Sequence, residues 1–590
     1  MTFLRELLAV IVGVFIATGI MFLILLVFVS ASASAFGDDK KVLVKNNSVL
    51  ELKLENQIKD YAPKSTDPFD EIFGLEEGKV GLQNLLNAIE NAKSDDNIKG
   101  ISIHTLFVNG GVAQTQAIRD KLLEFKESGK FIFAYSDFYD QKNYYLSSVA
   151  DSIFLNPVGA IDFKGLVSEV LYFKDFEENT GVKMEVIRHG KYKSAVEPFL
   201  TNKMSDANRE QITSFLKSIW SEIISDIGVS RNKNNDELNI IADNLLARNP
   251  ELALKNNMID GEVYEDEYET KLRALLDLDS VSKLNTVTIS DYITTGKGRL
   301  KSTSSDKIAI LYAQGDIRYG EGEENYVGQG KIIESLKKIR KDDKIKAVVL
   351  RINSPGGSAL ASELIWRELE LTKKEKPLVV SMGNYAASGG YYIACNADRI
   401  VAEPSTITGS IGVFGMIPNA SKLADNWGIN AEQVGTNKQS FGYSLFEPMN
   451  DDFHNFVKEG IEDVYETFVN RVSKGRNMSF NKVDSIAQGR VWTGAEAKQN
   501  GLVDELGSLE DAIKIAAELG GISDYMTTSY PRYKKDFKDA FKPFSMSSIA
   551  KESLLKEELG IENYEIYKNI KQFSEIKGIQ TRMPYIIEIK

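Results

Sequence analysis

The 590-residue sequence predicts an α/β protein that is made of two tandem copies of one strand–helix unit. Short apolar runs alternate with amphipathic segments of about 12 residues, which is typical of βαβ units around a sheet that is buried on both faces. The pattern then recurs about one half-chain further on. A composition of 43% hydrophobic and 26% charged residues excludes a chain that is disordered throughout.

The alternation is clearest in the second half of the chain. Apolar runs at 308–312, 347–352 and 377–381 predict strands, and amphipathic segments at 332–339 and 360–371 predict the helices between them. Because consecutive parallel strands need a crossover connection, this order predicts a parallel sheet that is covered by helices.

An internal repeat supports the duplication. Residues 95–99 (DDNIK) resemble residues 342–346 (DDKIK), which lie 247 positions later, and Tyr144-Tyr145 is repeated as Tyr391-Tyr392 at the same offset. A period of this length excludes a solenoid. We therefore predict four parts: an N-terminal membrane anchor at 1–36, a first repeat domain at 37–300, a second at 301–520, and a helical, charged tail at 521–590.

The anchor is predicted from an apolar run at residues 7–29, which is interrupted only by one threonine and two glycines. As a helix this run spans about 34 Å, enough to cross a bilayer. A cleaved signal peptide is the alternative, because residues 31–35 (ASASA) resemble a cleavage region, but the run is longer than a signal h-region. Counting the flanking cations would place the large domain inside the cell, yet long domains often translocate regardless of charge.

Composition also excludes several functions. The net charge of −13 argues against broad nucleic-acid binding, which needs clustered cations. The single cysteine, Cys395, excludes a disulfide scaffold. The three histidines, His104, His189 and His454, lie far apart in the sequence, so we predict no metal site and no cofactor.

Three segments rich in glycine and serine follow predicted strands of the second copy, at the sheet edge where ligands bind in α/β proteins. They are 353–357 (NSPGG), 383–392 (GNYAASGGYY) and 406–412 (TITGSIG). Each alone also fits an ordinary turn, helix cap or loop. Ser388 is the candidate nucleophile, because the small residues around it leave room for a substrate backbone.

A serine nucleophile needs a base. His189 is the only histidine near a motif, and Lys193, in the apolar segment 192–199 (YKSAVEPF), is the alternative, because burial lowers the pKa of a lysine. The first-copy residue that matches Ser388 is Gln141, and the second-copy residue that matches Lys193 is Ser440. Each copy therefore keeps half of a Ser/Lys pair, which predicts one site between the copies.

Together these segments resemble the bacterial signal peptide peptidase A family (protease IV) in its long, duplicated form. The motifs that carry the resemblance are 354–357 (SPGG), 385–391 (YAASGGY), 408–412 (TGSIG), 192–199, and 489–494 (GRVWTG) followed by 501–504 (GLVD). The resemblance implies a ClpP/crotonase-like fold and a membrane-anchored serine endopeptidase. It also implies a homotetramer that degrades cleaved signal peptides and other short apolar peptides on the periplasmic, extracytoplasmic side of the plasma membrane.

The resemblance also implies roles for single residues. Ser388 is expected to be the nucleophile and Lys193 the general base, with Ser410 bonding and orienting the lysine amine. The backbone N–H groups of Gly356 and Gly389 are expected to form the oxyanion hole. Two alternatives stay open: a crotonase-like acyl-CoA enzyme, which would give no role to the serine, and a catalytically silent scaffold of the same fold.

Overall fold

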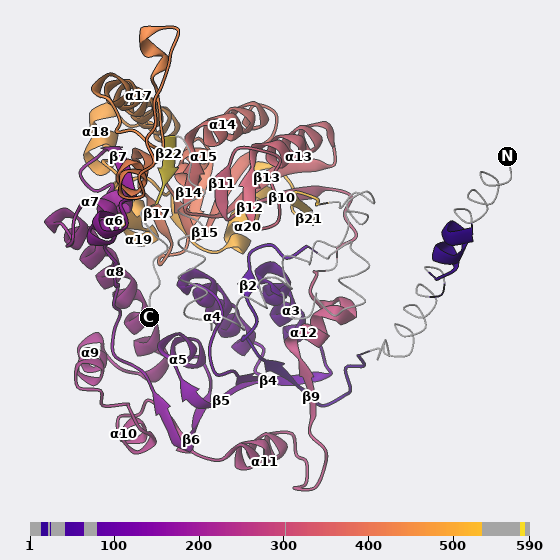
Figure 1. Cartoon of the computed structure of the whole chain (residues 1–590). Coiled ribbons are helices and arrows are strands. Elements are labelled where there is room, and N and C mark those ends of the chain that lie inside the picture. Colours follow the sequence, from indigo (N-terminus) through magenta and orange to yellow (C-terminus); the bar gives the residue numbers. More distant parts are fainter. Residues whose placement is uncertain are drawn as a thin grey trace.

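The computed structural model describes residues 13–21, 24, 42–63, 80–300, 302–533 and 579–583. Each half of the described chain contains a largely parallel sheet with helices packed on it, which confirms the predicted α/β class. Figure 1 places the sheet of the first repeat in the lower part of the molecule and that of the second repeat in the upper part, with helices α3 (Leu82–Ser94) and α4 (Val112–Lys126) between them.

The first-repeat sheet has the strand order β8-β6-β5-β4-β1-β9, and all of its pairings are parallel. Its strands are β1 (Ser48–Leu52), β4 (Ile98–His104), β5 (Phe131–Tyr139), β6 (Ser152–Ile161), β8 (Gly261–Glu262) and β9 (Asn285–Thr288). The helices of this repeat are α3 (Leu82–Ser94), α4 (Val112–Lys126), α5 (Gln141–Ser147), α6 (Lys174–Thr180), α7 (Glu197–Leu200), α8 (Asp206–Arg231), α9 (Asn235–Asp243), α10 (Pro250–Lys255), α11 (Glu265–Leu275) and α12 (Ile289–Tyr292).

The second-repeat sheet has the order β19-β17-β15-β13-β10-β21, with β16 and β20 on a branch from β15. Its strands are β10 (Lys307–Gln314), β13 (Ile345–Ser354), β15 (Leu378–Ala387), β16 (Arg399–Ala402), β17 (Ile407–Gly409), β19 (Val491–Thr493), β20 (Glu505–Leu506) and β21 (Met526–Tyr530). The helices are α13 (Gln329–Lys341), α14 (Ala359–Lys373), α15 (Gly389–Ala394), α16 (Ser421–Asn426), α17 (Asp451–Arg476), α18 (Phe480–Ile486), α19 (Gly494–Asn500) and α20 (Leu509–Leu519).

The repeat in the sequence corresponds to a repeat of helices in the structure. Helices α13 and α14 begin and end 247 residues after α3 and α4, and the 26-residue helices α8 and α17 also correspond. The expected strand at 347–352 forms the centre of β13, where every residue is buried because helices cover both faces of the sheet.

A third sheet joins the two halves of the chain. Its strand order is β12-β11-β14-β22-β18-β7. Strand β7 comes from the first repeat and pairs antiparallel with β18 of the second repeat along its whole length. The new strands are β7 (Lys183–His189), β11 (Asp316–Arg318), β12 (Tyr326–Gly328), β14 (Gly356–Ser358), β18 (Val413–Asn419) and β22 (Ile579–Arg582), and a separate pair joins β2 (Ile58–Lys59) to β3 (Val80–Gly81).

The predicted membrane anchor and the predicted helical tail are only partly covered by the described residues. Most of the apolar run at 7–29 lies outside them, and among the described residues we find no helix with the length and apolar character needed to cross a membrane. The prediction of a helical tail at 521–590 is wrong for two described segments, which form strands β21 and β22. Strand β21 pairs with β10, and β22 pairs with β14 and β18, so both add to sheets formed by other parts of the chain. Residues 534–578 and 584–590 lie outside the described residues.

Candidate active site

Ser388 lies at the sharp turn between β15 and α15. Its φ of 55° is uncommon for a residue with a side chain, and such backbone costs of the order of 1–3 kcal/mol, so the surrounding structure must hold it. The Ser388 N–H donates to the Gly409 carbonyl at 2.8 Å, which fixes the turn against β17. The side chain has no exposed surface.

Lys193 reaches Ser388 from the other repeat. It follows β7 and precedes a short 3₁₀ helix at Ser194–Val196. Its Nζ lies 2.8 Å from Ser388 Oγ, 3.1 Å from Ser410 Oγ and 3.1 Å from the Ser410 carbonyl oxygen. A neutral amine has two N–H donors and one lone pair, so it can donate to both Ser410 oxygens while its lone pair faces the Ser388 hydroxyl.

Burial sets the protonation of Lys193. The side chain is fully buried, and loss of hydration holds the pKa of its amine well below the usual value for lysine. Its neighbours are apolar: the Phe414 ring centre lies 6.0 Å from Nζ, and Ala195, Val196 and Met416 belong to the same cluster. A neutral amine in such a place is able to accept a proton.

Replacing Lys193 with methionine is expected to change the pH dependence of stability. From the lowered pKa up to 10.5, the unfolded chain binds a proton that the folded chain does not, so the parent gains stability as the pH rises. Lys193→Met removes this dependence. We therefore expect the free energy of unfolding of Lys193→Met to exceed that of the parent at the low end of this pH window. The difference should shrink by about 1.4 kcal/mol for each pH unit above it.

Thermal melts of both proteins at several pH values up to 10 measure this difference. Lys191→Met, which changes an exposed lysine two positions earlier, is the matched control and should follow the parent. A difference between Lys193→Met and the parent that stays constant with pH contradicts burial of a neutral amine.

Ser410 and the lysine are held by the segment that begins at Gly489. The Ser410 N–H donates to the Arg490 carbonyl at 2.7 Å, and Ser410 itself has a φ of 49°. A methyl group added to Gly489 would lie 2.6 Å from the Lys193 Cβ, so only glycine fits there. This contact gives the 489–494 motif a physical role, because it packs the backbone of the second repeat against the lysine of the first.

The two glycines that were expected to form an oxyanion hole converge beside Ser388. Gly356 has a φ of 100°, and a methyl group added to it would lie 2.7 Å from the Gly389 amide nitrogen. The Gly356 N–H donates to Ser354 Oγ at 3.2 Å in this structure. The start of β14 thus lies against the backbone amide of Gly389, the residue that follows Ser388.

A buried ion pair that the sequence did not predict joins Asp60 to Arg351 of β13, the strand that precedes this turn. Arg351, near the end of β13, donates to Asp60 Oδ1 from Nε at 2.9 Å and from Nη2 at 2.7 Å. Asn353 and Gln114 donate to the other oxygen of Asp60. Both charged side chains are 1% exposed. The partners are 291 residues apart in the sequence, so no local pattern could have indicated them.

Other candidates from the sequence lie elsewhere. His189 stacks on Tyr465 of α17 with a ring separation of 3.9 Å, whereas it is Lys193 that contacts Ser388. Ser440, the counterpart of Lys193, is exposed at the end of a short 3₁₀ helix, Lys438–Ser440.

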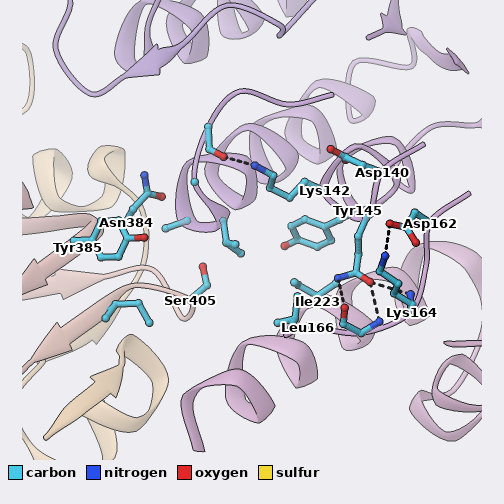
Figure 2. Close-up of a pocket in the computed structure, with 17 residues that line it drawn as sticks. Asp140, Lys142, Tyr145, Asp162, Lys164, Leu166, Ile223, Asn384, Tyr385 and Ser405 are labelled. Atoms are coloured by element: carbon cyan, nitrogen blue, oxygen red, sulfur yellow. Dashed lines mark hydrogen bonds and ion pairs between the residues drawn. The ribbon is translucent and has the colours of Figure 1, made fainter. Parts of the chain in front are cut away.

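Gln141, the counterpart of Ser388, lines a cavity of about 510 Å³ between the repeats. Figure 2 shows this cavity, to which Asp140, Lys142 and Tyr145 of the first repeat and Asn384 and Ser405 of the second contribute. The Gln141 side-chain oxygen accepts from the N–H groups of Lys164 and Gly165, and its amide donates to the Gly165 carbonyl. The cavity contains none of the predicted site residues, and Gln141 serves to hold a loop.

Comparison with known proteins defines the class to which this fold and site belong. The chain is 36% identical over 512 residues to "Protease 4" of Haemophilus influenzae, covering 84% of this chain and 83% of that protein. It is 35% identical to "Protease 4" of Salmonella typhi, covering 78% and 76% of the two chains. It is 32% identical to "Serine protease SPPA, chloroplastic" of Arabidopsis thaliana, covering 81% and 70%. The protein is therefore a serine peptidase.

Its family follows from the family models. The model of peptidase family S49 matches residues 124–279 and 370–523, one stretch in each half of the chain, and the Clp protease model matches residues 299–407. The chain belongs to peptidase family S49. The paired match agrees with the duplication that the sequence predicts.

Proposed function

We propose that this peptidase uses Ser388 as nucleophile and Lys193 as general base. The observation that carries the proposal is the 2.8 Å separation of Lys193 Nζ and Ser388 Oγ in a buried, apolar pocket. Lys193 takes the hydroxyl proton as Ser388 Oγ attacks the substrate carbonyl carbon, and the protonated amine returns it to the leaving amine, so that an acyl-enzyme remains. The same amine then activates the water that hydrolyses the acyl-enzyme.

Ser410 and the two glycines complete the proposed site. By accepting two N–H bonds from the Lys193 amine, Ser410 turns the lone pair towards Ser388. The amides of Gly356 and Gly389 are proposed to stabilise the negative oxygen of the tetrahedral intermediate. One such donor typically contributes about 3–4 kcal/mol to the transition state. No proposed step requires a cofactor or a metal.

The substrates and setting are proposed from the sequence and the site together. The apolar surroundings of Ser388 and Lys193 favour short apolar peptides, of which cleaved signal peptides are an example. We infer that residues 7–29 anchor a homotetramer in the plasma membrane, with the catalytic domain on the extracytoplasmic side. The apolar run is long enough to span a bilayer, which supports the anchor.

A fluorophosphonate reagent, which reacts with activated serines, tests the proposed pair. Peptide mapping by mass spectrometry is expected to find the adduct on Ser388. The rate of labelling should rise with pH, because a growing fraction of Lys193 becomes neutral as the pH passes its lowered pKa. Labelling on another serine, or an unchanged rate in Lys193→Ala, contradicts the proposal.

A further inference from the structure

The C-terminal strand β22 lies between the two strands that border the candidate active site. It pairs antiparallel with β14 on one side, beside which Figure 1 shows it, and with β18 on the other. Strand β14 begins at Gly356, and β18 begins three residues after Ser410. In register, Thr581 lies opposite Gly357, and Gln580 lies opposite both Ser358 and Phe414. Residues 579–582 thus bridge the site.

Thr581 lies over the two glycines beside Ser388. A methyl group added to Gly356 would lie 2.3 Å from the Thr581 carbonyl oxygen, and one added to Gly389 would lie 3.0 Å from the same atom. The Met583 N–H donates to the Pro355 carbonyl at 2.7 Å. Strand pairing of this kind uses main-chain groups, and it is how an extended peptide adds to an open sheet edge.

Side chains also hold this segment in place. Arg582 forms an ion pair with Asp316 of β11 at 3.2 Å, and both side chains are largely buried. Met583 is 2% exposed and belongs to the apolar cluster that also contains Ala387 and Ile407. Thr581 has no exposed surface. A second peptide chain has no room beside β14 while this strand is there.

We propose that residues 579–583 are a tethered inhibitor, which occupies the path of the substrate main chain and must leave before a peptide binds. The inference rests on the proposed function, because it takes the place next to Ser388, Gly356 and Gly389 to be the substrate site. The proposal also predicts which substrate side chains the site prefers. A substrate that takes this path is expected to favour a long apolar side chain where Met583 lies and a cation where Arg582 meets Asp316.

Kinetics distinguish a tethered inhibitor from a structural strand. A segment that competes with substrate raises the apparent KM by the inverse of the fraction of time the site is open, and leaves kcat unchanged. If the site of the full chain is open for about one tenth of the time, removal of the strand lowers KM about tenfold.

The experiment compares the full chain with a variant that ends at Gly578 and with full-length Arg582→Glu, which opposes the charge of Asp316. Arg248→Glu, at an exposed arginine of the first repeat, is the matched control. Hydrolysis of a fluorogenic apolar peptide should give a lower KM for both strand variants and an unchanged KM for the control.

A synthetic peptide with the sequence of residues 577–585 should inhibit the shortened chain competitively. An unchanged KM in both strand variants, even with a lower melting temperature, would mean that β22 is only structural.

A binding measurement separates this inference from the proposed function. The labelled 577–585 peptide is added to Ser388→Ala proteins with and without residues 579–590, and fluorescence anisotropy is recorded. Binding of the peptide to the shortened protein but not to the full chain supports the inference, whether or not the active proteins cleave the reporter peptide. If neither active protein cleaves the reporter peptide, that result counts against the proposed function alone. Absence of binding to the shortened, folded protein, or equal binding to both, overturns the inference.

Discussion

Ser388→Ala and Lys193→Ala are each expected to lower kcat/KM for an apolar reporter peptide by about 10⁴-fold or more. Without the hydroxyl no acyl-enzyme forms. Without the amine, Ser388 Oγ loses the proposed base, which lies 2.8 Å away and is its only side-chain hydrogen-bond partner among the described residues. The two residues act as a unit, so the double variant should be no worse than either single variant.

The control for this experiment is Lys191→Ala, which removes an exposed lysine from the same loop and should retain the activity of the parent. Circular dichroism and melting temperature establish that each variant is folded. A folded Lys193→Ala protein with substantial activity would show that another group serves as base. An active Ser388→Ala protein would reject the proposed nucleophile.

Asp60→Ala is expected to destabilise the protein by about 3–5 kcal/mol, because it leaves the Arg351 guanidinium buried without a counter-charge. Among the described residues, Arg351 would keep its bonds to Ser381 Oγ and the Met382 carbonyl alone, at 2.8 and 3.0 Å. Thermal unfolding should show a transition that is lower by roughly 3–5 °C. Activity should fall too, because the pair supports the strand that leads into the Gly356 turn.

A surface pair provides the comparison for this prediction. Glu269→Ala removes the partner of Arg273 on α11, and because that glutamate is 45% exposed, its loss should cost less than about 1 kcal/mol. The double variant Asp60→Leu/Arg351→Met should recover much of the lost stability, because no unpaired charge remains buried. If Asp60→Ala melts with the parent, the ion pair does not hold the two segments together.

The predictions from sequence succeeded where the signal is local or repeated. The expected strand at 308–312 lies within β10, and the expected helix at 360–371 lies within α14, because apolar periodicity reflects which side of an element faces the core. The offset of 247 residues, read from a few short matches, predicted helices that correspond residue for residue. The absence of a serine from one copy and a lysine from the other indicated a shared site, and the structure brings Ser388 and Lys193 together.

The missed features depend on partners that are distant in the sequence. Residues 526–530 and 579–582 were expected to be helical, and both are strands because sheets built elsewhere offer them open edges. Asp60 gave no signal of its own, since a lone aspartate in a loop is ordinary until Arg351 is placed beside it. The roles of Gly489 and Thr581 likewise depend on what lies within a few ångströms of them.

The sequence by itself indicated the α/β class, the duplication and Ser388 as candidate nucleophile, and the family resemblance carried by its motifs pointed to Lys193 and Ser410, because strand and helix periods, repeats and short motifs can be recognised in the sequence alone. Only the tertiary structure decided how the halves meet: the pairing of β7 with β18, the Asp60–Arg351 pair, and the strand that covers the site. Such contacts arise from the packing of the whole molecule. Their free energy depends on which groups lose water together, and no local pattern in the sequence carries that information.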